Sequence, residues 1–202
     1  MAIQDYASLV SAVADWLKRS DLNAVIPTFI QLAEQRISRD LKHYRMITDA
    51  SGTLVSGRFG LPNDFSSMAR LSVSVGGYDI ALEPVPNQRA LNDRLGGVPY
   101  GYYIEGDEVC ILGGSGDGDV TFKYYAKVTP LSVSSPSNWL LNTAPDVYLY
   151  GCLLEAAPYL EDDARIQIWL AGYDKAINSL QAESDNARYS PSARARPDFR
   201  VA

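Results

Sequence analysis

The chain has 202 residues, of which 47% are apolar and 21% charged, a composition typical of a globular protein that can bury a core. Its formal net charge of −6 excludes a protein whose whole surface binds nucleic acid or an anionic membrane. No apolar run approaches the roughly 20 residues that span a bilayer, and residues 1–6 lack the basic start of a secretory signal.

The first third of the chain predicts two amphipathic helices. In residues 6–19 the apolar positions recur at spacings of three and four: Leu9, Val13, Trp16 and Leu17. A second helix is expected to begin near Pro27, because proline has no N–H to leave unsatisfied in a first turn. Its predicted buried stripe is Ile30, Ala33, Ile37 and Leu41, and the polar residues Glu34, Gln35, Arg39 and Lys42 are placed outside it.

From about Ile47 the pattern changes to short β-prone segments separated by turn residues. Residues 71–75 alternate between apolar and polar and lead into Gly76-Gly77, which predicts a two-residue hairpin before the next strand, 78–82. About six or seven short strands follow one another in this region, which predicts a small antiparallel sheet, a sandwich or a partial barrel.

Two further helices are predicted after a serine-rich connector. The third is entered through Pro145 and is apolar on all sides, as expected of a centrally buried helix. The fourth is expected to open at Glu161 and to bury Ile166, Leu170, Tyr173, Ile177 and Leu180. The predicted fold is therefore α+β: a four-helix bundle of two N-terminal and two C-terminal helices, with an inserted small antiparallel β domain and an extended C-terminal tail.

The predicted division has four parts. Residues 1–46 form the N-terminal helix pair, 47–130 the inserted antiparallel β region, 131–187 the C-terminal helix pair that completes the bundle, and 188–202 an extended basic tail. The tail holds four arginines and one acid and therefore has a net charge of +3. Since the whole chain has a net charge of −6, the remaining residues carry −9. This asymmetry indicates a tail that binds an acidic partner.

The glycine-rich stretch Gly113–Asp119 has the composition of a possible ligand-binding loop. A phosphate-binding loop ends in Gly-Lys-Ser or Gly-Lys-Thr, and the first lysine here is Lys123, inside a predicted strand. A calcium loop needs oxygen ligands at fixed positions, and only Asp117 and Asp119 are offered. The stretch is interpreted as a flexible hairpin loop, with a contact loop or a weak cation site as alternatives.

The single histidine, His43, stands at the predicted end of the second helix, where a positive charge suits the helix dipole. One histidine and two cysteines, Cys110 and Cys152, cannot supply a metal site, and both cysteines are predicted to be buried thiols. The acids Glu161–Asp163 are adjacent on a helix, cannot flank one scissile bond, and are interpreted as helix-capping residues.

Five aromatic residues could in principle stack on nucleic acid bases. Because few basic residues lie between them, we expect them to pack inside the protein instead. These aromatic residues are Tyr124, Tyr125, Trp139, Tyr148 and Tyr150. The sequence therefore predicts no catalytic residue, no cofactor and no metal site.

Several stretches follow a pattern of packing and capping residues found together in one family: Asp15–Leu17, Ile26–Ile37, Arg39–Leu41, Leu61–Phe65, Asn138–Leu141, Ala144–Gly151 and Leu154–Leu160. In these stretches the chain resembles the head–tail adaptor (connector) proteins of short-tailed bacteriophages. The resemblance covers nearly the whole chain, less firmly in the predicted strands, and it does not extend to the last dozen residues.

The resemblance implies a structural protein of the virion neck, assembled in the host cytoplasm and without catalysis. It implies a homo-oligomeric ring, typically a dodecamer, that binds the portal protein and a downstream tail or nozzle protein. The genome would pass through the lumen of the ring without specific binding, and no membrane is involved. An acidic body fits this role, since it would repel the DNA that slides past it.

The basic tail gives the candidate partner-binding residues. We expect Arg188, Tyr189, Arg194, Arg196 and Arg200 to dock on the portal, unless the tail is merely a solvated segment. A different class of function is a DNA-binding accessory factor that acts through the same arginines. A third alternative is a cell-wall hydrolase that uses carboxylates such as Glu155 or Asp162.

Overall fold

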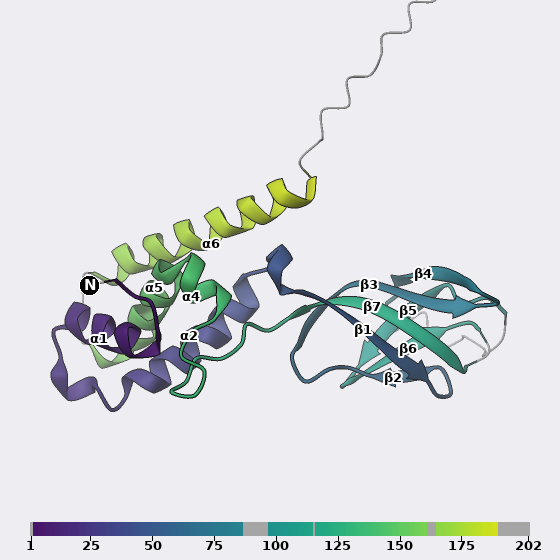
Figure 1. The fold of residues 1–202 in the computed structure, drawn as a ribbon, viewed down its shortest axis with the longest axis horizontal. Coiled ribbons are helices and arrows are strands. Elements are labelled where there is room, and N and C mark those ends of the chain that lie inside the picture. The colour runs from purple at the N-terminus through teal and green to yellow at the C-terminus, as the bar shows by residue number, and fades with distance from the viewer. Residues whose placement is uncertain (1, 87–96, 115, 161–164, 190–202) are drawn as a thin grey trace, which may run out of the picture. The chain divides into compact units, whose positions relative to one another are not determined.

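The computed structural model describes residues 2–86, 97–114, 116–160 and 165–189. The chain divides into two compact units (Figure 1). One comprises Met1–Tyr44 and Pro130–Ala202 and is called the helical unit; the other comprises Arg45–Thr129 and is called the β unit.

The described part of the helical unit contains five α-helices: α1 (Tyr6–Leu17), α2 (Ile26–Asp40), α4 (Trp139–Thr143), α5 (Pro145–Ala156) and α6 (Ile166–Tyr189). Short 3-10 turns are present at Ser20–Leu22, Tyr44–Met46 and Ala157–Tyr159. Side chains start two of the helices. Asp5 accepts a hydrogen bond from the Ser8 N–H at 2.8 Å to cap α1, and Asn138 accepts one from the Leu141 N–H at 2.8 Å to cap α4.

Helix α5 lies at the centre of the helical unit and contacts α1, α2, α4 and α6. Its buried residues occur on every side of the helix, so the prediction of a centrally buried, apolar helix is confirmed. Gly151 allows α5 to pack closely on α2, because a Cβ atom there would lie 3.2 Å from the Cβ of Ala33.

The β unit contains one seven-stranded sheet: β1 (Ile47–Leu54), β2 (Arg58–Gly60), β3 (Phe65–Val75), β4 (Tyr78–Pro84), β5 (Gly101–Glu105), β6 (Glu108–Leu112) and β7 (Gly118–Ala126). The strand order is β1-β7-β3-β4-β5-β6-β2. A bridge between Val55 and Arg58 joins the two outermost strands at one end, so the sheet is nearly closed. The predicted hairpin at Gly76-Gly77 is confirmed, since Val75 pairs with Tyr78 across these two residues.

The inner face of this sheet forms a hydrophobic core of its own. Leu71, Val109 and Val120 are fully buried there, and Phe122 contacts both Phe59 and Tyr124 through its ring. These residues share one face because successive side chains of a strand point to opposite faces, so that every second side chain reaches the inner face. On β1, β3 and β7 the outer face carries a group of polar residues: Asp49, Ser51, Arg70, Ser72, Thr121 and Lys123.

The predicted four-helix bundle with a small antiparallel insert is wrong. A bundle needs helices that each bury one stripe, whereas α5 is apolar all round and takes the centre with the other helices packed against it. The β unit is a nearly closed sheet with its own core, and it is not purely antiparallel, because β4 pairs with β5 in parallel. Helix α6 also extends to Tyr189, so the first two residues of the predicted extended tail are helical.

The interpretation of Gly113–Asp119 as a hairpin loop is also wrong. These residues connect β6 to β7, which are not neighbours in the sheet. In its described part the connection is held to the Ser56-Gly57 turn: Asp117 accepts a hydrogen bond from the Ser56 N–H at 3.0 Å, and the Gly57 N–H donates to the Gly116 carbonyl.

Candidate functional site

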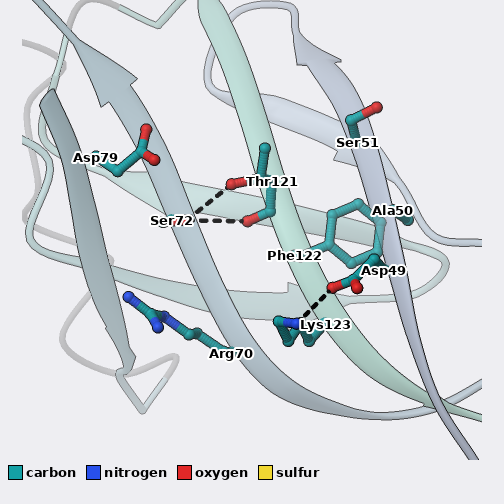
Figure 2. A pocket seen from close by; sticks show the side chains of 9 residues that line it. All are labelled: Asp49, Ala50, Ser51, Arg70, Ser72, Asp79, Thr121, Phe122 and Lys123. Carbon is teal, nitrogen blue, oxygen red and sulfur yellow. Dashed lines mark hydrogen bonds and ion pairs between the residues drawn. The ribbon is translucent and has the colours of Figure 1, made fainter. Parts of the chain in front are cut away.

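The outward face of the β unit carries a polar hollow of about 540 Å³. It lies over β1, β3, β4 and β7 (Figure 2). Strand register explains how it is built, because Ser51 and Ser72 both pair with Thr121, and Asp49 and Arg70 both pair with Lys123. The polar residues of the hollow thus form two cross-strand rows, Ser51–Thr121–Ser72 and Asp49–Lys123–Arg70.

Most of the polar groups in the hollow bind one another. Lys123 Nζ lies 2.9 Å from an Asp49 carboxylate oxygen, and the Ser72 and Thr121 hydroxyls are 2.9 Å apart. Asp79 accepts a hydrogen bond from the Ser74 hydroxyl. The Arg70 guanidinium is directed away from the Asp49–Lys123 pair, as Figure 2 shows. The hollow contains no histidine or cysteine, and it is suited to binding polar or charged groups of a partner.

A second polar cluster is buried inside the helical unit, around Glu34. One Glu34 carboxylate oxygen accepts a hydrogen bond from the Leu131 N–H at 2.6 Å and lies 3.5 Å from the Tyr148 hydroxyl, which itself accepts from Asn138 Nδ2 at 2.7 Å. Glu34 is only 8% exposed, and burial raises its pKa to about 7. Burial likewise raises the pKa of the Tyr148 hydroxyl.

Two further polar contacts join helices of this unit. The Arg36 guanidinium on α2 donates to Glu155 on α5, with Nε and Nη2 each 2.7 Å from the same carboxylate oxygen. The Tyr173 hydroxyl on α6 donates to Asp40 at 2.9 Å, and burial raises the pKa of that hydroxyl. Glu155, one of the carboxylates considered for a hydrolase, is therefore bound in an ion pair.

His43 does not stabilise the end of α2 as predicted, because α2 ends at Asp40 and the His43 side chain is fully buried. Its ring stacks on Trp139 with the centroids 5.1 Å apart and also contacts Tyr44. The predicted packing role of Tyr124, Tyr125 and Tyr148 is confirmed, since all three are buried. Cys110 and Cys152 are buried thiols, also as predicted.

The predicted portal-binding residues fall at the end of the described chain. Arg188 is exposed in the last turn of α6, and Tyr189 is the last residue of that helix. Arg194, Arg196 and Arg200 lie outside the described residues, as do Glu161, Asp162 and Asp163. The structure therefore does not test whether these arginines act together.

The part of the chain that the structure describes contains no group of three or more His, Cys, Asp or Glu residues placed to hold a metal ion. Within the same residues, no helix combines the length and apolar character needed to cross a membrane.

Sequence reasoning missed both the hollow and the Glu34 cluster. Arg70 could have been found by extending the alternation of residues 71–75 back by one position, which places it on the same face as Ser72 and Ser74. Glu34 could have been found from helical spacing, because it stands four residues after Ile30 and three before Ile37.

Comparison with known families decides the identity. The family model described as SU10 adaptor protein matches residues 4–197. The chain belongs to the SU10 adaptor protein family. No curated protein matches the sequence.

Membership of the SU10 adaptor family confirms the resemblance to phage adaptors. This SU10 adaptor protein is a structural component of a bacteriophage virion, and an adaptor contacts other head or tail proteins. The polar hollow of the β unit and the end of α6 are therefore candidate surfaces for protein partners.

Proposed function

We propose that this SU10 adaptor protein forms a homo-oligomeric ring, a dodecamer, that joins the portal to the tail and extends the DNA channel. The family match over residues 4–197 carries the proposal. Each of the four predicted segments has its own role. The ring is built by the helices of residues 1–46 and 131–187. The tail or nozzle protein is contacted by residues 47–130, and the portal is bound by residues 188–202.

Exposed apolar residues of the helical unit support a contact between subunits. Trp16 is 46% exposed and Ile168 is 67% exposed. Arg165 lies near both residues. Its Nη1 donates a hydrogen bond to the Trp16 carbonyl at 3.2 Å, and Arg165 precedes Ile168 of α6 by three residues. Large apolar side chains exposed in this way are often found at protein–protein interfaces.

The charge distribution supports passage of DNA through the ring without specific binding. Outside residues 188–202 the chain carries −9, which is the total of −6 less the +3 of the basic tail. Like charge on the lumen would keep the genome from adhering to it. Glu155 is held by Arg36, which supports a structural role without catalysis.

The sequence of the basic tail supports docking as an extended strand. From Ser190 to Arg200 every even-numbered residue is polar, and three of these residues are Arg194, Arg196 and Arg200. From Pro191 to Val201 every odd-numbered residue is apolar, and one of them is Phe199. In a strand these two sets lie on opposite faces. One face would pack on apolar groups of the portal, while the other presents arginines to its acidic groups.

The two prolines of the tail fit the same mode of binding. Pro191 and Pro197 are both at odd positions, and in a strand the N–H groups of odd residues all point to one edge. The edge formed by the even residues therefore keeps a complete set of N–H donors. We propose that this edge pairs with an exposed strand of the portal.

Deletion of residues 188–202 tests the docking proposal. The truncated chain is expected to lose co-purification with the portal, and unchanged co-purification would show that another surface binds it. Light scattering of the pure protein, alone and mixed with portal, tests the ring. A mass equal to one chain under both conditions would contradict the ring proposal.

A further inference from the structure

The hollow of the β unit contains one cation whose charge is not neutralised within the described residues. Its charged residues are Asp49, Arg70, Asp79 and Lys123. Lys123 is paired with Asp49 at 2.9 Å, and Asp79 is bound by the Ser74 hydroxyl. Arg70 forms no ion pair or side-chain hydrogen bond with any residue that the structure describes. Within the described residues, its planar fork of five donors has no acceptor.

The backbone also distinguishes this position. The register of β3 against β7 shifts between Met68 and Arg70, so that Ala69 is an extra residue in β3. A bulge of this kind bends its strand and increases the local twist, and bulges occur often beside functional sites. Here the bulge directly precedes Arg70, where β3 also stops pairing with β4.

The floor of the hollow adds neutral hydrogen-bonding groups beside this cation. Ser51, Thr121 and Ser72 form a row across β1, β7 and β3, next to the row that ends in Arg70. Hydroxyl groups can donate or accept, so the row can bind the remaining oxygen of an acid or the backbone of the segment that carries it.

The acids in the hollow select among anionic partners. Asp49 and Asp79 stand on either side of the hydroxyl row and would repel a nucleic acid strand, which brings many phosphates to one surface. A single carboxylate brings only one negative charge and can bind the Arg70 fork through both of its oxygens. The hollow therefore favours one acidic side chain on a protein.

We propose that the hollow receives a carboxylate side chain of the tail or nozzle protein, and that Arg70 is the residue that recognises it. The inference rests on the proposed adaptor function, because that function places the β unit against the next tail component. It adds the chemistry of the contact and the residue that determines its specificity.

Calorimetric titration of the full-length chain with the purified tail or nozzle protein of the same virion tests the inference. Arg70→Ala is expected to weaken binding by about tenfold and Arg70→Glu by about a hundredfold, since the second change adds repulsion. Arg70→Lys should lie between wild type and Arg70→Ala, because it keeps the charge and loses the fork. The control is Lys127→Glu, an equal charge reversal on an exposed residue outside the hollow, which should change binding by less than about threefold.

Chemical footprinting gives an independent measurement. Phenylglyoxal modifies exposed arginines, so modification of Arg70 should fall at least about fivefold in the complex while that of exposed Arg39 stays constant. The inference would be overturned if the Arg70→Glu variant bound the tail or nozzle protein as tightly as the wild-type chain does. It would also be overturned if complex formation left the modification of Arg70 unchanged. Either result would leave the adaptor function standing. Absence of any binding by the wild-type chain would overturn the proposed tail contact, and this inference with it. Stronger protection of Arg70 by an oligonucleotide than by the tail protein would assign the hollow to nucleic acid instead.

Discussion

The Glu34 carboxylate of α2 accepts a hydrogen bond from the Leu131 N–H at 2.6 Å, which fixes the connector leaving the β unit to the second helix of the helical unit. Because Glu34 is 8% exposed, this contact is made by a buried group whose pKa is raised to about 7. The ionisation of one side chain is thus coupled to the folding of the helical unit.

Glu34 is expected to make the helical unit less stable as pH rises. A pKa raised above the unfolded value means that the folded state binds the proton more tightly, so this stabilisation is complete below about pH 4.5 and is lost as pH rises to about 7. The free energy of unfolding should fall by roughly 3 kcal/mol from this group, and Glu34→Gln should remove that dependence. Tryptophan fluorescence can follow unfolding, because Trp16, Trp139 and Trp169 all belong to the helical unit. An equal pH dependence in wild type and Glu34→Gln would contradict the assignment.

Replacement of Gly151 is expected to separate α2 from α5. A Cβ atom at Gly151 would already stand 3.2 Å from the Ala33 Cβ, so Gly151→Val should lower the free energy of unfolding by about 1–3 kcal/mol. Ala171→Val places the same side chain at an exposed position of α6 and should cost less than about 1 kcal/mol. Chemical denaturation measures both, and equal effects would show that the α2–α5 contact is not tightly packed.

The Arg36–Glu155 ion pair is expected to contribute more than an exposed pair. Its side chains are 34% and 17% exposed, against 45% and 59% for Arg19 and Asp21. Glu155→Gln should cost about 1–2 kcal/mol, whereas Asp21→Asn should cost less than about 0.5 kcal/mol. A double-mutant cycle of Arg36→Ala with Glu155→Ala isolates the coupling, and a value near zero would exclude a stabilising pair.

The order of residues in the basic tail, and not only its charge, should determine portal binding. Exchanging Phe199 with Arg200 keeps composition and net charge but places each side chain on the opposite face of a strand. Portal affinity should fall by about tenfold or more. Exchanging Arg194 with Ser192 keeps the alternation and serves as the control. Equal binding by both variants would favour a purely ionic tail.

Filter binding at low salt should show negligible affinity of the whole chain for duplex DNA. The four arginines of 188–202 would then be outweighed by the acidic remainder of the chain. Binding that falls steeply with added salt and disappears on deletion of the tail would support the DNA-binding alternative instead.

Local patterns predicted the local features of this fold. The apolar circumference of α5 predicted its central position, and Gly76-Gly77 predicted the β3–β4 hairpin. The arrangement of helices could not be predicted in the same way, because it depends on contacts between residues far apart in the chain, such as Ala33 with Gly151. The non-neighbouring connection of β6 to β7 is of the same kind.

The candidate site is harder to predict, since polar residue types are mostly exposed in folded proteins and give no sign of burial by themselves. Glu34 has the spacing of a buried residue but the chemistry of an exposed one, and its partner Leu131 lies far along the chain. Trp16 is the reverse case, an apolar residue predicted to be buried that is 46% exposed. In both cases the side chain's environment is decided by partners that no local window contains.

The pairing of Ile47 with Tyr125 closes the base of the β unit, so the chain enters and leaves this unit on adjacent strands. An insertion with neighbouring ends can be exchanged for another domain of similar spacing while the host fold keeps its own contacts. Recombination between phages can therefore replace residues 45–129 as a cassette. The surface that this unit offers to a partner protein can then evolve independently of the helices that carry it.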